Sequence, residues 1–317
     1  MYTKQSRNCV IGSMGNYFSF FNPLFDSSFC FFILKKINLT YTKYGSKISD
    51  IHLSHRIDEC YFDFAKKFGL KSTCVKSKEH SLTKLIEKKG MPLIIELNSK
   101  MLSYHSLYKI NKWNFSHFIT ILGIQRNKLL ISDCYIPKIN GSEVYEGFAD
   151  LKNIKKAWRK NYYWYYDSLD AVDFVKNFVI DDLLCKRIFH ENMKLLLEST
   201  IPCQKVFAED FAQYIKNYEL KDIKEHLNNL GVQIQTLGLI SSRVYLKEFL
   251  IDHLNYRNND ILNFIESDIN EWHKICFAIY KSAVVNSLSS FDAVRRMIIN
   301  QSEKEFSVYL KLNKEIG

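Results

Sequence analysis

Residues 113–133 read WNFSHFITILGIQRNKLLISD, and the pattern in this segment is clear enough to interpret the rest of the chain from it. Residues 116–123 and residues 128–132 are both rich in β-branched and aromatic side chains. The four residues between these runs are short and polar enough to turn. Two such runs with a short polar break predict an antiparallel β-hairpin.

The predicted hairpin brings together two polar side chains. His117 lies at the start of its first strand and Asp133 at the end of its second, so we expect an imidazole to meet a carboxylate. That contact fixes the histidine tautomer and stabilises the protonated ring, which the base of a catalytic nucleophile requires. The nucleophile must then come from elsewhere in the chain, and Cys9 is the residue we choose. This arrangement predicts a cysteine-dependent acyl-transfer enzyme.

Cys9 is expected at the start of a helix. Apolar residues follow it at helical spacing, and Ser6 or Asn8 can cap the first turn. The residues of this apolar face are Val10, Ile11, Met14, Tyr17, Phe18 and Phe21. A helix N-terminus stabilises a thiolate. The alternative is that Cys9 is one buried thiol among eight cysteines.

Composition indicates an ordered globular protein with room for one large core or two ordinary ones, because apolar residues make up 47% of its 317 residues and only four are proline. The apolar run 29–34 is too short to cross a bilayer, and no signal-like segment follows the first residues. We therefore expect a cytoplasmic protein without a membrane partner. The scattered cysteines contain no CxxC pair, which favours reduced thiols and predicts neither disulfides nor a metal site.

The formal charge of +10 raises the question of a nucleic-acid partner. The lysines are spread along the chain, and no arginine-rich run or nucleic-acid motif accompanies them. We expect a solvated basic surface and no nucleic-acid binding. An acidic protein domain would suit this charge as a partner.

The pattern divides the chain into two predicted domains. Residues 1–168 are expected to form an α+β catalytic domain with an antiparallel sheet, and residues 169–317 an all-helical domain. The expected elements of the first are extended segments at 29–34 and 39–44, helices at 57–68, 81–89 and 150–158, strands at 73–75, 92–97 and 161–166, and a loop at 134–147. Those of the second are helices at about 173–198, 205–229, 232–255, 258–285 and 289–313, with Pro202 among the breaks.

An early cysteine that opens a helix, followed by a histidine and an aspartate on a hairpin, resembles the papain-like fold in the form of the bacteriocin-leader peptidases. Residues 91–158 resemble more specifically the N-terminal domain of the butirosin-biosynthesis acyltransferase family. The residues that carry this likeness are the strand Pro92–Leu97, Leu102, Tyr104, His117-Phe118, Gly123 and Asp133. The chain departs from the family pattern at Asn98 and Ser103, where the family has an acid and a proline.

The resemblance implies a role for each residue of the triad. Cys9 would be the nucleophile, His117 the base and Asp133 the orienting acid. Members of this family take an acyl group from a carrier-protein thioester and pass it to an amine in secondary-metabolite or nonribosomal peptide biosynthesis. The implied partners are an acyl or peptidyl carrier protein and a small amine or diamine, with the carrier's phosphopantetheine thioester in place of a separate cofactor. Since a thioester is already activated, no nucleotide is needed, and the sequence holds no P-loop.

Three further residues are candidates for the site. Papain-like enzymes usually place an oxyanion-hole glutamine six residues before the cysteine, where this chain has Thr3, so Gln5 is the candidate donor. Tyr104 and Trp113 are candidates for lining the substrate site, although both residue types at such positions commonly pack in a core. His105 is expected to be exposed.

Two other functions remain open from the sequence. One is a papain-like thiol peptidase or hydrolase that uses the same triad. The other is a non-enzymatic basic adaptor in which Cys9, His117 and Asp133 have no joint role.

Overall fold

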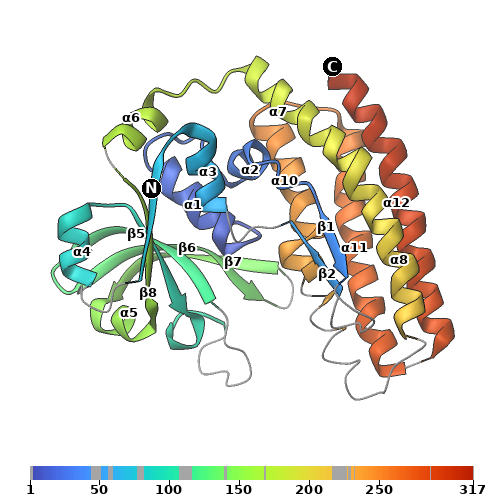
Figure 1. Ribbon diagram of the computed structural model, residues 1–317, viewed down its shortest axis with the longest axis horizontal. Helices are drawn as coiled ribbons and strands as arrows, with labels where there is room; N and C mark the ends of the chain where they lie inside the picture. The colour runs from blue at the N-terminus through green and yellow to red at the C-terminus, as the bar shows by residue number, and fades with distance from the viewer. Residues whose placement is uncertain are drawn as a thin grey trace. The chain divides into compact units, whose positions relative to one another are not determined.

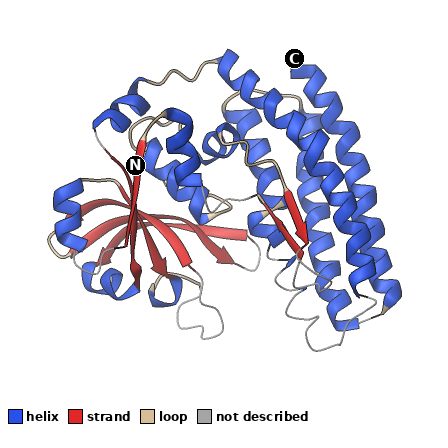
Figure 2. Ribbon diagram, viewed as in Figure 1, coloured by secondary structure: helices blue, strands red, loops and turns tan. Residues whose placement is uncertain are grey.

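The computed structural model describes residues 3–43, 51–55, 60–76, 82–106, 116–138, 141–167, 169–215, 227, 230–231, 233–285 and 287–316. The chain forms two compact units. Unit 1 comprises Met1–Cys30 and Asp58–Val179, and unit 2 comprises Phe31–Ile57 and Ile180–Gly317. Strands dominate the first and helices the second (Figures 1 and 2).

Unit 1 is built on an antiparallel sheet with the strand order β3-β8-β4-β5-β6-β7. The strands are β3 (Lys71–Lys76), β4 (Leu93–Asn98), β5 (Ser116–Gln125), β6 (Lys128–Lys138), β7 (Gly141–Asp150) and β8 (Trp158–Asp167). The helices are α1 (Cys9–Ser19), α3 (Cys60–Phe68), α4 (Leu82–Lys89), the 3₁₀ turn η3 (Ser99–Met101), α5 (Leu151–Ala157) and α6 (Leu169–Asn177). Helix α2 (Ser27–Ile33) includes the boundary between the units. Helices and antiparallel strands thus combine as expected for an α+β chain.

The two faces of this sheet carry different layers. Side chains on a strand alternate between faces, and on β5 Ile119 and Ile121 join a buried cluster with residues of α4 and α5. Thr120, between them, donates a hydrogen bond of 3.0 Å from its hydroxyl to the carbonyl of Ser13 on α1. Helix α1 therefore covers the face opposite α4 and α5, as Figure 1 shows.

The predicted hairpin is confirmed as β5 and β6, which pair antiparallel. Its turn is shorter than expected, because Gln125 already pairs with Lys128. Arg126 adopts a left-handed φ of 54°, as a two-residue hairpin turn requires. The second strand also continues past Asp133 to Lys138, so Asp133 does not end it.

Two other sequence expectations are wrong. Residues 29–33 lie in helix α2, because the Asp26 carboxylate accepts the backbone N–H of Phe29 at 2.9 Å and caps a helix start. The expected loop 134–147 instead contains the end of β6 and much of β7, which pair from Lys128–Asp150 to Lys138–Gly141 with a bulge after Asp133. The half-exposed edge strand β7 carries no apolar alternation that would distinguish it from a polar loop.

Unit 2 is a helical bundle with one small hairpin. Its elements are β1 (Thr40–Lys43), β2 (Ile51–Ser54), α7 (Asp182–Leu195), the π turn η4 (Leu196–Thr200), α8 (Ile201–Ile215), the π turn η5 (Gln233–Leu237), α10 (Leu239–Asp252), α11 (Asn259–Val285) and α12 (Leu288–Ile316). Pro202 does not separate helices as expected, because α7 continues through η4 into α8 and the wider π turn precedes the proline. None of the helices in the described part of the chain is long and apolar enough to span a bilayer.

The early segment 31–57 belongs to unit 2 because its aromatic residues pack on the bundle. Phe31 contacts the ring of Tyr245 at 4.7 Å between centroids, and Phe32 stacks on Phe249 at 4.5 Å. The Thr200 hydroxyl accepts the backbone N–H of Leu39 at 3.0 Å. The sequence division at residue 168 assigned this segment to the first domain, and it assigned α6 to the second, whereas α6 lies in unit 1.

The core of unit 2 encloses a charged network. Arg243 on α10 is fully buried, and it is paired with Glu305 at 2.5 Å and with Asp268 at 3.5 Å. Trp272 donates from its indole N–H to Glu305 at 2.6 Å. Burial and the charge of Glu305 raise the pKa of Asp268. Burial would also raise the pKa of Glu305, but the positive charge of Arg243 lowers it. The charge of Arg243 thus favours the ionised form of Glu305, whereas burial beside Glu305 favours the protonated form of Asp268.

We expect Arg243→Leu to lower the free energy of unfolding by about 3–5 kcal/mol, since it leaves a carboxylate buried without its cation. Urea unfolding followed by circular dichroism measures this change. Lys247→Ala on the same helix is the matched control, because the Lys247–Glu266 pair is exposed and should contribute less than about 1 kcal/mol. Equal losses in the two variants would contradict a dominant role for the buried pair.

Candidate functional site

Asn8 determines where helix α1 begins. Its side-chain oxygen accepts the backbone N–H groups of Val10 at 2.8 Å and of Ile11 at 3.3 Å, and its extended backbone makes it the N-cap. Cys9 is therefore the first helical residue, as expected. The free amides of the first turn give this end of the helix a positive potential.

Two glycines let α1 lie close to its neighbours. A Cβ atom on Gly12 would come within 2.2 Å of the Cys134 sulfur on β6, and one on Gly15 would come within 2.6 Å of the backbone nitrogen of Ser27. The segment before the helix is tied to β6 as well, because the Ser6 N–H donates to the Cys134 carbonyl at 2.9 Å. A side chain at Gly12 would push the helix, and Cys9 with it, away from β6, and one at Gly15 would push it away from Ser27 at the start of α2.

His117 and Asp133 form the contact that the hairpin predicts. The Nε2 atom of His117 lies 2.7 Å from the Oδ2 atom of Asp133. Their exposed fractions are 4% and 0%, so water does not compete for this hydrogen bond. The register pairs Thr120 with Ser132, which makes His117 and Asp133 diagonal neighbours on one face of the sheet. The other carboxylate oxygen accepts the backbone N–H of Tyr135 at 3.2 Å.

The side chain of Cys9 lies near enough to the same imidazole to influence its pKa. Burial alone would lower the pKa of His117, but the charge of Asp133, the hydrogen bond with Asp133 and a hydrogen bond with Cys9 raise the pKa to about 10. Because Nε2 faces the carboxylate, we infer that Nδ1 faces the thiol. Among the seven cysteines whose side chains the structure describes, only Cys9 and Cys203 are partly exposed, and all seven are free thiols. The three residues selected from the sequence are thus together, and Cys9 is open to solvent.

A second histidine lies against the pair. His105 is buried, with an exposed fraction of 4%, which makes the expectation of an exposed His105 wrong. Its ring meets that of His117 edge to face, with centroids 4.7 Å apart. Burial and the nearby charge of His117 lower the pKa of His105 to about 4. No pattern in the sequence indicated that His105 is buried beside His117, because a histidine in a polar connection between elements is ordinarily exposed.

Tyr104 lies beside the carboxylate, as a residue at the site should. Burial and the charge of Asp133 raise the pKa of its hydroxyl well above the usual value. Its ring stacks on that of Tyr145 at 4.1 Å between centroids. Both rings line a pocket of about 180 Å³, together with Met101, Leu102, Ser103, Lys128, Phe148, Ala149, Asp150, Asn153 and Ile154.

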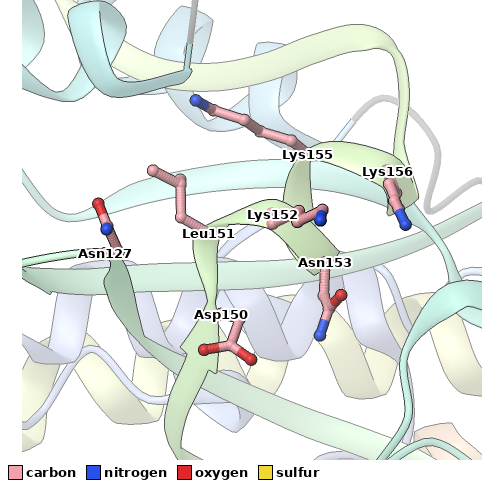
Figure 3. A pocket seen from close by; sticks show the side chains of 7 residues that line it. All are labelled: Asn127, Asp150, Leu151, Lys152, Asn153, Lys155 and Lys156. Carbon is pink, nitrogen blue, oxygen red and sulfur yellow. The ribbon is translucent and has the colours of Figure 1, made fainter.

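The larger pocket of about 590 Å³ lies elsewhere. Figure 3 shows its lining residues around the start of α5: Asn127, Asp150, Leu151, Lys152, Asn153, Lys155 and Lys156. None of the candidate catalytic residues is among them. Three lysines leave it basic, but its polar groups come from a short surface helix, and no buried polar side chain points to a ligand.

The proposed oxyanion donor is engaged elsewhere. The Gln5 side-chain amide donates to the carbonyl of Ser142 at 2.5 Å and to its hydroxyl at 2.9 Å. Thr3, at the position of the family glutamine, is buried and hydrogen-bonded to Ser132 on β6 at 2.8 Å. Asn8 accepts the amides of Val10 and Ile11, which leaves the backbone amide of Cys9 itself as the first-turn donor nearest the thiol. Trp113, the other candidate for the substrate site, lies outside the described residues.

No protein-family model matches the chain, and no curated protein matches it. The geometry of the cluster around His117 is therefore the basis for assigning a function.

We expect Gly15→Ala to lower the free energy of unfolding by about 1–3 kcal/mol through overpacking against the Ser27 backbone, although alanine favours a helix more than glycine does. Thermal and urea unfolding measure the change. Gly123→Ala on β5 is the control, because its nearest new contact, Leu130 Cβ, would lie at an ordinary 3.6 Å. A Gly15→Ala chain as stable as the parent would mean that α1 does not lie this close to Ser27.

The ion pair also predicts how stability depends on pH. In Cys9→Ala, which removes the titration of the thiol, the Asp133 charge still holds the pKa of His117 above its ordinary 6.5. The contribution to stability is complete below pH 6.5 and is lost as pH rises toward the folded-state pKa, because over that range only the folded chain keeps the proton. The free energy of unfolding should fall by up to about 1.4 kcal/mol per pH unit.

Urea unfolding between about pH 6 and pH 9 measures this slope. The reference is Cys9→Ala with Asp133→Asn, whose other titrating groups are the same, so that the difference between the two chains isolates the pair. Parallel pH curves for the two chains would contradict an ion pair between His117 and Asp133.

Proposed function

We propose that this chain is a cysteine-dependent acyltransferase of papain-like architecture, with Cys9 as nucleophile, His117 as acid and base, and Asp133 as the group that orients the imidazole. One observation carries the proposal. The buried imidazole is hydrogen-bonded at Nε2 to a carboxylate 2.7 Å away, and it also interacts with a partly exposed thiol. Nucleophile, base and orienting group in one chain of contacts are the signature of covalent catalysis.

Each proton transfer follows from this arrangement. Because the pKa of His117 is about 10, the imidazole carries a proton at neutral pH, and the form of Cys9 that reacts is its thiolate. The Cys9 sulfur then attacks the carbonyl carbon of a thioester as the C–S bond to the carrier breaks. His117 gives its proton to the departing carrier thiol, which leaves an acyl group on Cys9 and a neutral imidazole.

The second half-reaction returns the enzyme to its starting state. An amine attacks the acyl-Cys9 carbonyl and passes its proton to the neutral His117, while the bond between the carbonyl carbon and the sulfur breaks. The products are an amide and the original pair of sulfur and imidazolium. The oxyanion that forms in each step needs hydrogen-bond donors, and the backbone amide of Cys9 is the nearest one that Asn8 does not accept. Gln5 would first have to leave Ser142 to add another.

The substrates follow from the surroundings of the site. The pocket beside Tyr104 offers apolar walls from Met101, Leu102 and Phe148, which suit an acyl chain. The formal charge of +10 suits an acidic carrier protein that delivers the acyl group as a phosphopantetheine thioester. The resemblance to the butirosin-biosynthesis acyltransferase family supports a small amine or diamine as the acceptor, in a cytoplasmic biosynthetic pathway.

Intact-mass spectrometry with an acyl-carrier protein, or with a small acyl thioester in its place, tests the proposal. We expect a single acyl adduct on Cys9 that disappears when a diamine is added, with release of the amide. Cys9→Ala should form no adduct. Cys203→Ala is the matched control, because Cys203 is the other partly exposed thiol, and it should react like the parent chain.

His117→Ala should slow formation of the adduct by about 10²–10⁴-fold while circular dichroism stays unchanged. An adduct that is lost only to water would make the chain a hydrolase. An unchanged mass in the parent chain with every thioester would rule out acyl transfer.

A further inference from the structure

His105, His117 and Asp133 form a compact buried cluster beyond what the proposed acyl transfer needs. One ligand atom from each residue can be chosen so that all three lie within 4.8 Å of one another. The exposed fractions are 4%, 4% and 0%. Acyl transfer uses only the imidazole of His117 and the carboxylate of Asp133, so His105 has no part in that chemistry.

We propose that His105, His117 and Asp133 form a binding site for a zinc-class divalent metal ion. Two imidazole nitrogens and one carboxylate oxygen are the ligand set that Zn²⁺ takes in sites with three protein ligands and one open position. Imidazole selects zinc, copper, nickel and iron over magnesium and calcium, which prefer oxygen ligands alone. The sequence analysis predicted no metal site, because the cysteines are scattered, but the proposed ligands here are histidine and aspartate.

The surroundings hold the three ligands in place. The backbone N–H of His105 donates to the Leu102 carbonyl at 2.9 Å, and its ring lies at 71° to that of His117. The Asp133 carboxylate accepts the backbone N–H of Tyr135 and lies beside the Tyr104 side chain. Such outer contacts orient the ligands of a metal site and raise its affinity. Ligand atoms bound to one zinc ion lie about 3.3 Å apart, given bonds of about 2 Å. The 2.7 Å between His117 Nε2 and Asp133 Oδ2 would therefore lengthen, and any separation near the 4.8 Å limit of the cluster would shorten.

Metal binding and acyl transfer exclude each other, and this part of the inference rests on the proposed function. A histidine nitrogen binds a metal through its lone pair. Coordination therefore breaks the hydrogen bond between His117 and Asp133, and any proton on the bound nitrogen leaves to solvent. A chain holding zinc here has no free acid or base for the thiol of Cys9. Zinc-class ions would then be reversible inhibitors of this enzyme.

Titration with Co²⁺, followed by visible absorption, tests the site without reference to activity. The full chain carrying Cys9→Ala is used, so that the partly exposed thiol beside His117 cannot contribute. We expect one Co²⁺ per chain, with ligand-field bands and without the intense band of a thiolate ligand, and displacement by Zn²⁺. Adding His105→Phe, which keeps an aromatic ring against His117, should weaken binding by at least about tenfold.

Two more variants make the outcome decisive. Asp133→Asn in the Cys9→Ala chain removes a different ligand and should weaken Co²⁺ binding as His105→Phe does, which covers the case in which His105→Phe fails to fold. His190→Ala in the same chain is the control, because His190 is partly buried and bonded to Asn313 in unit 2. Absence of Co²⁺ binding to Cys9→Ala, or equal binding to all folded variants, would overturn the metal site.

The activity of the parent chain separates the two proposals. Zn²⁺ should block acylation of Cys9 and a chelator should restore it, whereas the His105→Phe chain should keep its acylation in the presence of Zn²⁺. Inhibition of equal strength in both chains would mean that zinc binds the thiol rather than the cluster. If no thioester acylates the parent chain, acyl transfer fails, and the cobalt titration still decides whether the metal site exists.

Discussion

The hydrogen bond between His117 and Asp133 is the contact on which the site depends, and its position within the sheet explains its strength. Both residues come from one hairpin, so a short turn sets their separation and little conformational entropy is lost in bringing them together. Neighbouring strands on both sides exclude water from the pair. In that environment a charged hydrogen bond is stronger than at a surface, and it raises the pKa of the His117 ring. Every role discussed for Cys9, His105 and Tyr104 follows from contact with this pair.

Unit 2 contains a buried ionic group of a different kind. Arg243, Asp268 and Glu305 come from the three successive helices α10, α11 and α12, and their hydrogen-bond partners Trp272 and Tyr309 are also buried. A network of this kind stabilises one arrangement of helices over others, because any shift would leave a charge unpaired. The His117–Asp133 pair in unit 1 lies near the partly exposed sulfur of Cys9, whereas the charged residues of the network in unit 2 are all buried.

The sequence predicted those features that local chemistry decides. The hairpin, the helix start at Cys9 and the expected helix ends at residues 68 and 89 each follow from a few neighbouring residues, since both ends precede a glycine with positive φ. The sequence predictions were wrong where contacts between residues distant in the chain determine the local structure. Residues 29–33 are as apolar as a buried strand, and β7 resembles a loop until its pairing with β6 is known. His105 was missed for the same reason, because its burial depends on strands that follow it in the chain. Whether the cluster catalyses acyl transfer cannot be read from spacing, since identical spacing serves peptidases and acyltransferases.

The insertion of residues 31–57 into the other unit has a consequence for how the protein is made. Phe31 and Phe32 leave the ribosome early, yet Tyr245 and Phe249, on which they pack, are synthesised much later. During that interval the aromatic segment at Phe31 and Phe32 lacks the helix on which it packs. Exposed apolar segments of this kind bind chaperones or associate with other chains. A fragment that ends at residue 168 would keep this segment permanently without the bundle it packs on. Neither unit is therefore a continuous stretch of chain that can mature on its own as it emerges.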